Sequence, residues 1–527
     1  MPALTFHAEL TVRALRALAG AGVLGPVRPD RLARLALAPL RLGLGPATMV
    51  ASAAARHPDQ PALVDERGRL GYAELDRRGA AIAAGLDVGP GDSLAVMCRN
   101  HRGFVEAMLA GSRCGADLLL LNTEFSAAQL AEVMEREKPA AVVYDEEFAD
   151  ALSDVGLPRV LGWHEGAPDA PTLDDLASRG GARSSRTQGR LVLLTSGTTG
   201  TPKGAPRKPS LRSLVGPMTA LLSEVPLRAR EPIVVGPPFF HGFGFAYLAL
   251  GLFLGSTVLM RRRFDPEAVL AAIDEDRATT FIGVPVMHQR IMELSEEVRS
   301  RYNISSLRAL ISAAAPLSPA LASELMDEFG DVLYNLYGST ETGFGAIAGP
   351  ADVRAAPGTV GRVPFGTTLK ILADDGRALG PGETGHVYVG GELVFEGYSG
   401  GGSKETVDGL MNTGDLGHLD ESGRLFIDGR EDDMIVSGGE NVFPAEVEDV
   451  LARHEQVDDV AVTGVEDDEF GQRLRAYVVT ASELSEDQVK AYVKENLARY
   501  KVPREVVFVD ELPRNPTGKL LKAELPG

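Results

Sequence analysis

The sequence predicts an α/β fold: a large N-terminal domain of α/β subdomains with a β-rich subdomain, followed by a small C-terminal α+β domain. From Ala47 onward, apolar runs of strand length alternate with helix-length segments, which is typical of largely parallel sheets. After the turn signal at Pro357 and Gly358 the expected strands become shorter, and past Arg430 the spacing changes again. We expect an extension over 1–45, an N-terminal domain over 46–430 and a C-terminal domain over 431–527.

The individual elements follow from apolar runs, helical periodicity and turn residues. The large domain is expected to contain strands at Ser93–Met97, Ala140–Tyr144, Leu191–Leu194, Pro232–Val235, Thr257–Met260 and Thr280–Ile282, helices at Tyr72–Leu86 and Ala127–Glu137, and shorter strands at Thr368–Ile371 and His386–Val389. The C-terminal domain is expected to contain a helix at Glu446–Arg453, strands at Val460–Val465, Leu474–Val479 and Glu505–Val509, and a helix opened by the capping-box pattern of Ser485 and Gln488.

The composition is that of a globular protein. The chain has 527 residues, 44% hydrophobic and 24% charged, which is long enough for about three domain-sized cores. Its net charge of −20 disfavours binding to nucleic acid, because both molecules are negative. Any site for a phosphate group must therefore have its own positively charged side chains close by. Two cysteines, Cys98 and Cys114, are too few for a disulfide framework and fit the reducing cytoplasm. No run approaches about 18 uninterrupted apolar residues, so no membrane-spanning segment is expected.

Residues 1–45 differ from the rest of the chain. They carry six arginines against two acids, interleaved with leucine and alanine, which predicts basic helices. Such a segment can pack on the catalytic domain or lie on an anionic membrane, and both possibilities stay open. Gly20 to Gly25 match the spacing GxGxxG, but they follow a helical stretch and run into Pro26, so a Rossmann-type oxidoreductase is not expected.

The run LVLLTSGTTGTPKG, from Leu191 to Gly204, joins an apolar strand to a loop of the size that holds a phosphate. Its glycines free the backbone to curl around an anion. The groups that can converge there are the Lys203 ammonium and the hydroxyls of Thr195, Ser196, Thr198 and Thr199. The run is not a Walker A loop, because Pro202 precedes the lysine and Gly204 follows it.

Five further motifs follow in a fixed order: PPFFHGFGF at 237–245, YGSTETG at 337–343, NTGDLG at 412–417, GREDDMIVSGGENVFPAEVE at 429–448 and NPTGK at 515–519. The ordered set, over about residues 48–522, resembles the adenylate-forming superfamily of acyl-CoA synthetases, carrier-protein adenylation domains and luciferases. Within it, the motifs are most similar to those of fatty-acyl-CoA and aryl-CoA ligases. The resemblance implies a mobile C-terminal lid and the use of ATP, Mg²⁺ and CoA.

The resemblance also implies roles for individual residues at the nucleotide. Glu341 and Thr195 would hold Mg²⁺, Tyr337 would cover the adenine, and Asp415 would bind the ribose hydroxyls beside the donor fork of Arg430. Ala314 and Ala315 would line the base, where the family usually has glycines. The other residues implied to bind ATP or AMP are Ser196, Gly197, Thr198, Thr199, Gly200, Lys203, Gly338 and Thr340.

Three further roles come from the resemblance. Lys519 would reach from the lid to bridge the substrate carboxylate and the α-phosphate, and the lid would then rotate about Asp432. Rotation would present Ser437, Gly438 and Gly439 to a pantetheine tunnel, where a side chain would obstruct the thiol arm. The acyl pocket would be formed by His241 as a gate, together with Phe243, Phe245, Gly283, Val284 and Pro285.

The sequence thus predicts an ATP-dependent acyl-CoA ligase that activates a hydrophobic carboxylic acid as an acyl-adenylate and releases AMP and pyrophosphate. Fatty, aryl and polycyclic acids all remain open as substrates. The alternatives are an enzyme that loads a carrier-protein pantetheine and one that runs a single half-reaction. A non-catalytic sensor is disfavoured, because both Lys519 and Glu341 are present.

Overall fold

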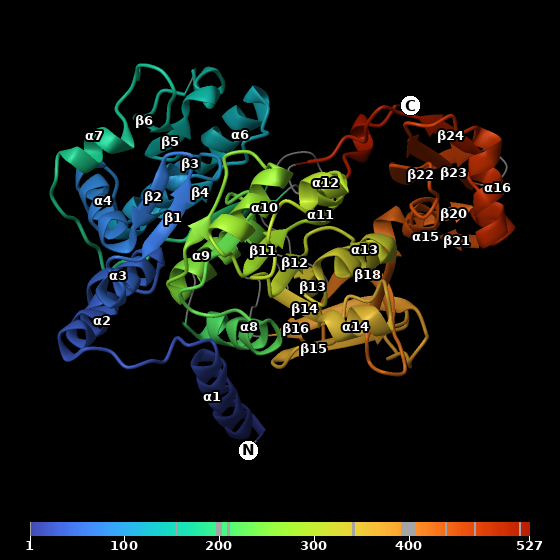
Figure 1. The fold of residues 1–527 in the computed structure, drawn as a ribbon, viewed down its shortest axis with the longest axis horizontal. Helices are drawn as coiled ribbons and strands as arrows, with labels where there is room; N and C mark the ends of the chain where they lie inside the picture. The colour runs from blue at the N-terminus through green and yellow to red at the C-terminus, as the bar shows by residue number, and fades with distance from the viewer. Residues whose placement is uncertain are drawn as a thin grey trace. The chain divides into compact units, whose positions relative to one another are not determined.

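A computed structural model describes residues 2–153, 155–195, 203–207, 211–339, 343–391, 406–437, 440–467, 471–515 and 518–526. The chain divides into two compact units. Figure 1 shows the helices and strands along the chain. Among the described residues, the first unit contains 2–283 and 290–311, and the second contains 284–289, 312–391 and 406–526. Among the described residues, no helix combines the length and apolar character needed to span a bilayer.

The N-terminal extension is helical and lies in the first unit. It forms α1 (Pro2–Gly20) and α2 (Pro29–Leu42), and α3 (Pro46–Arg56) follows. One face of α1 packs on α8 (Leu211–Glu224), and α2 packs on α3. The extension therefore makes the packing contacts that one interpretation of the sequence required.

A six-stranded sheet in the first unit has the order β6 (Arg159–Trp163), β5 (Ala141–Asp145), β3 (Ser93–Met97), β4 (Asp117–Leu120), β7 (Leu191–Thr195) and β8 (Lys203–Arg207). All its strands are parallel except β8, which is antiparallel to β7. Buried aliphatic side chains of β3, β5 and α6 share one core. The helices between the strands are α4 (Tyr72–Gly85), α5 (Arg102–Cys114), α6 (Ala127–Glu137) and α7 (Leu173–Ser178).

A second set of strands in the same unit has the order β2 (Gly68–Gly71), β1 (Pro61–Asp65), β10 (Val258–Leu259), β9 (Ile233–Val235), β11 (Thr280–Gly283) and β12 (Ala309–Ser312). The helices of this region are α8, α9 (Gly242–Leu254), α10 (Pro266–Glu275), α11 (Pro285–Met292), which begins in the second unit, and α12 (Glu296–Arg299). The expected strands of the large domain are therefore confirmed, with ends that shift by one or two residues.

From residue 312 onward, the second unit contains α13 (Pro319–Phe329), the antiparallel pair β13 (Leu333–Ser339) and β14 (Gly343–Ala348), and α14 (Pro350–Ala355). An antiparallel sheet follows, built from β15 (Thr367–Leu372), β16 (Gly385–Gly391), β17 (Thr406–Val407), β18 (Leu410–Leu419) and β19 (Leu425–Arg430). The β-rich subdomain expected after Gly358 is confirmed.

The C-terminal part has its own core, formed by buried side chains on its strands and helices, among them Val447, Val462, Leu474 and Val489. Its elements are β20 (Ile435–Ser437), β21 (Glu440–Val442), α15 (Pro444–Leu451), β22 (Asp459–Asp467), β23 (Gly471–Val479), α16 (Glu486–Asn496) and β24 (Glu505–Phe508). The capping box at Ser485 is present. The domain boundaries at 45/46 and 430/431 stay predictions.

One carboxyl group lies half-buried beside this C-terminal core. Glu448 on α15 accepts a hydrogen bond from the backbone N–H of Val462 at 2.7 Å. Burial raises the pKa of Glu448 from 4.5 to about 7, and the same cause raises that of Asp449 to about 6. The positive charges of Lys522 and Arg514 lower the pKa of Glu448 but do not cancel the effect of burial. Between about pH 4.5 and 7, the folded protein therefore holds a proton on Glu448 that the unfolded chain releases.

We expect Glu448→Gln to stabilise this domain above about pH 7. Between pH 4.5 and about 7 the folded state binds the extra proton, so its stability falls as the pH rises through that window and is constant above it. Glutamine keeps the oxygen that accepts from the Val462 N–H and removes the cost of burying a negative charge, which amounts to about 3 kcal/mol. Hydrogen exchange of α15 and β22 amides in the full chain, corrected for intrinsic rates, measures it. A variant with the same pH dependence as the wild type would contradict the assignment.

Candidate active site

The two ends of the predicted phosphate loop are held side by side. Thr195, the last residue of β7, pairs with Lys203, the first residue of β8. Because β7 is parallel to β4, the loop leaves the carboxyl end of a parallel strand, where open α/β sheets place their ligand sites. The residues between, including Ser196, Gly197, Thr198, Thr199 and Gly200, lie outside the described part of the chain, so their contacts stay predictions.

Tyr337 and Asp415 form the best-defined polar contact of the candidate site. The Tyr337 hydroxyl donates to Asp415 Oδ2 at 2.5 Å, and Arg430 Nη1 lies 3.5 Å from Asp415 Oδ1 (β13, β18 and β19). Burial, followed by the charge of Asp415, raises the pKa of Tyr337 well above its ordinary value. Tyr337 therefore remains a neutral donor. The second unit brings together three of the residues that the sequence implied at the nucleotide.

The NTGDLG motif explains how Asp415 reaches this position. Asn412 Oδ1 accepts from the Gly414 N–H at 2.8 Å, and Thr413 Oγ1 accepts from the Asp415 N–H at 3.1 Å. Gly414 has a φ of 81°, which favours glycine. Asp415 then lies opposite Arg430 in the register of β18 and β19. The motif is thus an irregular stretch of β18 whose side-chain hydrogen bonds to the backbone orient the Asp415 carboxylate.

Glycines hold the Tyr337 ring in place. A Cβ on Gly345 would lie 3.0 Å from the Tyr337 ring, so the ring packs directly on the backbone of β14. A Cβ on Gly338 would lie 1.9 Å from the carbonyl oxygen of Gly343, which requires glycine there for packing alone. Thr340 and Glu341 lie outside the described residues, and their proposed contacts with ATP and Mg²⁺ stay predictions.

Ala314 has a backbone conformation that glycine adopts more easily. Its φ is 71°, in the left-handed region, and it follows the buried Ala313 directly after β12. A non-glycine residue there costs on the order of 1–2 kcal/mol. Ala314 and Ala315 stand where the family usually has glycines. Ala314 nevertheless adopts the left-handed backbone conformation that a glycine would favour. Strain of this kind is concentrated at functional sites.

The first residue of the predicted acyl pocket is a neutral histidine. We call its aromatic part, His241, Phe243 and Phe245, the wall of the pocket. His241 precedes α9 with its ring 5.5 Å from that of Phe240, and burial lowers its pKa to about 4. Phe243 and Phe245 are half-buried on α9, and the Phe243 ring meets Tyr247 edge-on at 5.2 Å. Gly283 ends β11, while Val284 and Pro285 belong to the second unit. His241 therefore contributes no positive charge at neutral pH.

Asn100 supports the segment before His241, and the sequence did not single it out. Its Nδ2 donates to the carbonyl of Pro237 at 2.9 Å, and its Oδ1 accepts from the Phe239 N–H at 2.8 Å. Asn100 is buried and follows the carboxyl end of β3. That position, at the edge of a parallel sheet, was the one signal in the sequence that could have identified it.

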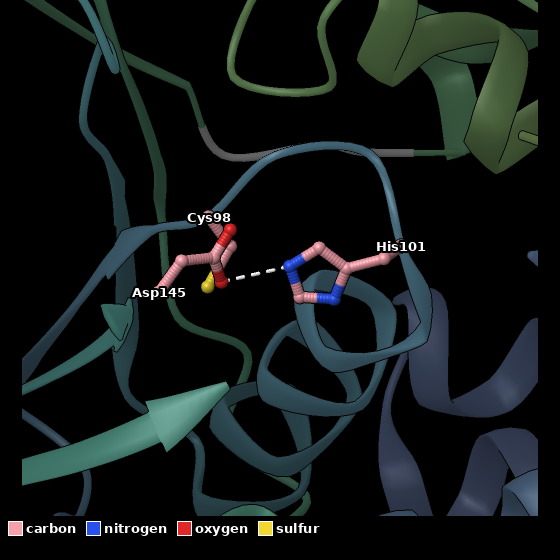
Figure 2. A group of neighbouring side chains, drawn as sticks. All are labelled: Cys98, His101 and Asp145. Atoms are coloured by element: carbon pink, nitrogen blue, oxygen red, sulfur yellow. Dashed lines mark hydrogen bonds and ion pairs between the residues drawn. The ribbon is translucent and has the colours of Figure 1, made fainter. Parts of the chain in front are cut away.

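Three buried side chains brace the loop that carries Asn100 (Figure 2): Cys98, His101 and Asp145. Asp145 at the end of β5 accepts from His101 Nε2 at 2.7 Å and from the Arg99 N–H at 2.9 Å. His101 Nδ1 accepts from the Gly103 N–H at 3.0 Å, so the ring proton lies on Nε2. The loop after β3 is thereby tied to β5.

These three groups resemble a metal-ligand set, because their ligand atoms lie within 4.8 Å of one another. The geometry favours hydrogen bonding instead. Two ligands at about 2.0 Å from a tetrahedral zinc stand about 3.3 Å apart, whereas His101 Nε2 and Asp145 Oδ1 are separated by 2.7 Å. Burial, and then the charge of Asp145, raise the pKa of the Cys98 thiol, which keeps it protonated.

Lys519 lies at a braced turn of the C-terminal domain. The Asn515 N–H donates to the Lys519 carbonyl and the Lys519 N–H donates to Asn515 Oδ1, both at 2.9 Å. Lys519 is exposed, and within the described chain its ammonium makes no hydrogen bond or ion pair. A Cβ on the preceding Gly518 would lie 2.7 Å from Val286 Cγ1, so the turn lies close to the segment that follows Pro285.

The predicted hinge and tunnel residues are described in part. Asp432 lies in the short 3₁₀ turn Glu431–Asp433, beside the ion pair of Asp433 with Lys522 at 2.7 Å. Ser437 ends β20 and pairs with Glu440 on β21. Gly438 and Gly439, which connect the two strands, lie outside the described residues.

Comparison with known proteins covers nearly the whole chain. The AMP-binding enzyme family matches residues 50–399, and the AMP-binding enzyme C-terminal domain matches 446–519. Feruloyl-CoA synthase of Amycolatopsis sp is 34% identical over 86% of this chain and 93% of its own. The 3-[(3aS,4S,7aS)-7a-methyl-1,5-dioxo-octahydro-1H-inden-4-yl]propanoyl:CoA ligase of Rhodococcus jostii is 35% identical over 88% and 94%. The o-succinylbenzoate CoA synthetase of Bacillus subtilis, solved with its acyl-adenylate, superposes with a TM-score of 0.78 at 28% identity over 90% and 97%.

We expect Asn100→Ala to lower kcat/KM for the acid by about tenfold to a hundredfold while leaving the KM for ATP close to that of the wild type. The change leaves two buried backbone groups of the 237–239 segment without their partner, which costs about 1–3 kcal/mol. Steady-state kinetics with each substrate varied in turn measures it. Asn122→Ala, at the corresponding point after β4, removes only a bond within its own turn and serves as the control. Equal losses toward acid and ATP would contradict a positioning role.

Proposed function

The chain belongs to the AMP-binding enzyme family, and from that premise we propose that its acid substrate is hydrophobic and carries a ring system. The protein is an ATP-dependent acid–CoA ligase. It activates a carboxylic acid as an acyl-adenylate with release of pyrophosphate, then transfers the acyl group to the thiol of CoA and releases AMP. Its cofactors are ATP, Mg²⁺ and CoA.

The observation that carries the substrate proposal is the uncharged wall around α9. Phe243 and Phe245 offer half-buried aromatic surface, and His241 is neutral because burial lowers its pKa to about 4. Such a wall favours apolar surface on the acid and provides no partner for a second carboxylate. Two relatives that share about a third of the sequence are named for a feruloyl and an octahydroindenyl propanoyl group, which both contain rings. Straight-chain fatty acids are the alternative.

The first half-reaction brings two anions together, so we assign the charged residues to that task. Mg²⁺, when bound, supplies positive charge at the phosphate oxygens, and Thr195 and Glu341 would hold it. Lys203 would face the phosphates at the start of β8. Tyr337, Asp415 and Arg430 have a geometry that fits a nucleoside, with a carboxylate for the ribose hydroxyls and an aromatic face for the base. The turn that carries Lys519 would supply the cation between carboxylate and α-phosphate.

The second half-reaction is assigned to the C-terminal domain in another orientation. Asp432 lies in a short turn between β19 and β20, where a small change of backbone angles would redirect all that follows. Ser437, Gly438 and Gly439 would then line the path of the pantetheine arm. The acceptor alternative is a carrier-protein pantetheine, and a second alternative is an enzyme that completes the first half-reaction alone. Turnover with free CoA and with a holo carrier protein separates these cases.

We also propose a cytoplasmic location. The chain has only two cysteines, and its substrates ATP and CoA are found in the cytoplasm.

We expect Lys519→Ala to reduce adenylation by about a hundredfold to a thousandfold, because loss of one electrostatic stabiliser costs about 3–4 kcal/mol. Thioester formation from preformed acyl-adenylate should change little. Pyrophosphate release and thioester formation are measured separately. Lys494→Ala, which removes an exposed lysine of α16, is the matched control. Pyrophosphate release at the wild-type rate would show that Lys519 does not act in the first half-reaction.

We expect Phe245→Ala to shift selectivity toward larger acids, because it enlarges the wall without adding charge. Each methylene that the substrate buries contributes about 0.8 kcal/mol, so acids that differ by a ring should separate by more than tenfold in kcat/KM. A panel of fatty, aryl and polycyclic acids, assayed by pyrophosphate release for wild type and variant, measures the shift. Phe508→Ala, at an exposed position of β24, is the control. If wild type and variant showed the same rank order of acids and the same ratios of kcat/KM, Phe245 would not belong to the acyl pocket.

A further inference from the structure

The exposed hydrophobic side chains of this protein are concentrated at its N-terminus. Nine large hydrophobic residues are exposed in the described chain, and seven of them lie between residues 12 and 44. They are Val12, Leu15, Leu24, Leu32, Leu37, Leu40 and Leu44. Single exposed leucines on a protein surface need no explanation, but a contiguous apolar patch marks an interaction site.

The helix α2 has two apolar faces. Ala38 and Leu42 are buried on the side that packs against α3. At about 100° per residue, a second set of aliphatic residues covers an arc of about 140° on another side. This exposed face consists of Leu32, Ala33, Ala36, Leu37 and Leu40, and Leu32 and Leu40 are each 58% exposed.

Arginines border this exposed face. Arg34 and Arg41 project beside it in the helical repeat, and neither makes an ion pair with a described residue. The pattern recurs on α1, where Leu10 and Ala17 are buried, Val12 and Leu15 are exposed, and Arg16 lies next to them. One side of each helix thus packs on the first unit, and another side exposes aliphatic residues and arginine. Figure 1 shows the two helices at the N-terminal, blue end of the chain.

The charge of this segment is opposite to that of the protein. Six arginines and two acids give residues 1–45 a charge of +4, and because the whole chain carries −20, the remainder carries −24. An anionic surface therefore attracts this segment and repels the rest of the molecule. The face of α2 contains no aromatic and no uncharged polar side chain, which are the groups that typically give a protein interface its specificity.

We propose that the exposed face of α2 docks on a bilayer of anionic phospholipid. The helix lies in the plane of the interface, its leucines reach the boundary of the acyl chains, and Arg34 and Arg41 bind lipid phosphates. This surface is separate from the ligase site and does not depend on the identity of the acid. It holds the enzyme at a surface by a peripheral contact.

The test is flotation of the full chain with vesicles of phosphatidylcholine alone and of phosphatidylcholine mixed with phosphatidylglycerol. We expect binding to the mixed vesicles, weakened by added salt, because exposed charges are screened. Arg34→Gln with Arg41→Gln should lower the partition coefficient about fivefold for each arginine. Leu32→Ser with Leu37→Ser and Leu40→Ser should lower it about tenfold for each leucine. Arg377→Gln with Phe508→Ser, at exposed positions elsewhere, should leave it unchanged.

The proposal is wrong if the arginine variant and the leucine variant bind mixed vesicles as well as the wild type does. Equal binding of the wild type to both kinds of vesicle would also overturn it. The exposed face of α2 could instead bind a second copy of this chain, and light scattering at several protein concentrations tests this. A dimer that the leucine variant abolishes, without vesicle binding by the wild type, would assign the face to a second copy. Because α2 does not contribute to the ligase site, unchanged pyrophosphate release shows that the variants are folded. The arginine pair, which alters exposed side chains only, keeps the test decisive if the leucine variant fails to fold.

Discussion

The constraint on which this structure depends is electrostatic: two anions must meet in a protein that itself carries a charge of −20. The positive charge for this task has to be local, because many arginines are engaged elsewhere. Arg78 pairs with the buried Glu106 and Arg102 with the buried Asp65, and both pairs brace the first unit. We assign to the substrate a short set of cations at the ends of strands and in a turn. Lys203 begins β8, Arg430 ends β19, and Lys519 is exposed on a braced turn.

Two neutral groups are consistent with the same constraint. Burial keeps His241 uncharged in the first unit, and burial next to Asp415 keeps Tyr337 protonated in the second, so neither group adds a charge of its own. Precision comes from the backbone. Asn100 fixes the 237–239 segment, and the Asp145 carboxylate ties down the loop that carries Asn100. The chemistry is thus assigned to few side chains, and much of the surrounding polar network holds the backbone that presents them.

The sequence predicted what is local. Parallel strands, the β-rich subdomain and the capping box at Ser485 are encoded within short windows and were found there. The motifs also located Tyr337, Asp415 and Arg430, but not the bond between Tyr337 and Asp415, which joins residues 78 positions apart. Asn100 and Glu448 were missed because an isolated asparagine or glutamate gives no signal until folding buries it. The second apolar face of α2 was equally hidden, since periodicity cannot tell a packed face from an exposed one.

The central claim is that the carboxylate attacks the α-phosphorus of ATP. The most direct measurement uses an acid labelled with oxygen-18 in its carboxylate, turned over with ATP and CoA, with mass spectrometry of the products. When the CoA thiol displaces AMP from the acyl-adenylate, one carboxylate oxygen stays on the phosphorus. The account predicts one heavy oxygen in AMP and none in pyrophosphate. Unlabelled AMP, or ADP with labelled orthophosphate, would contradict it.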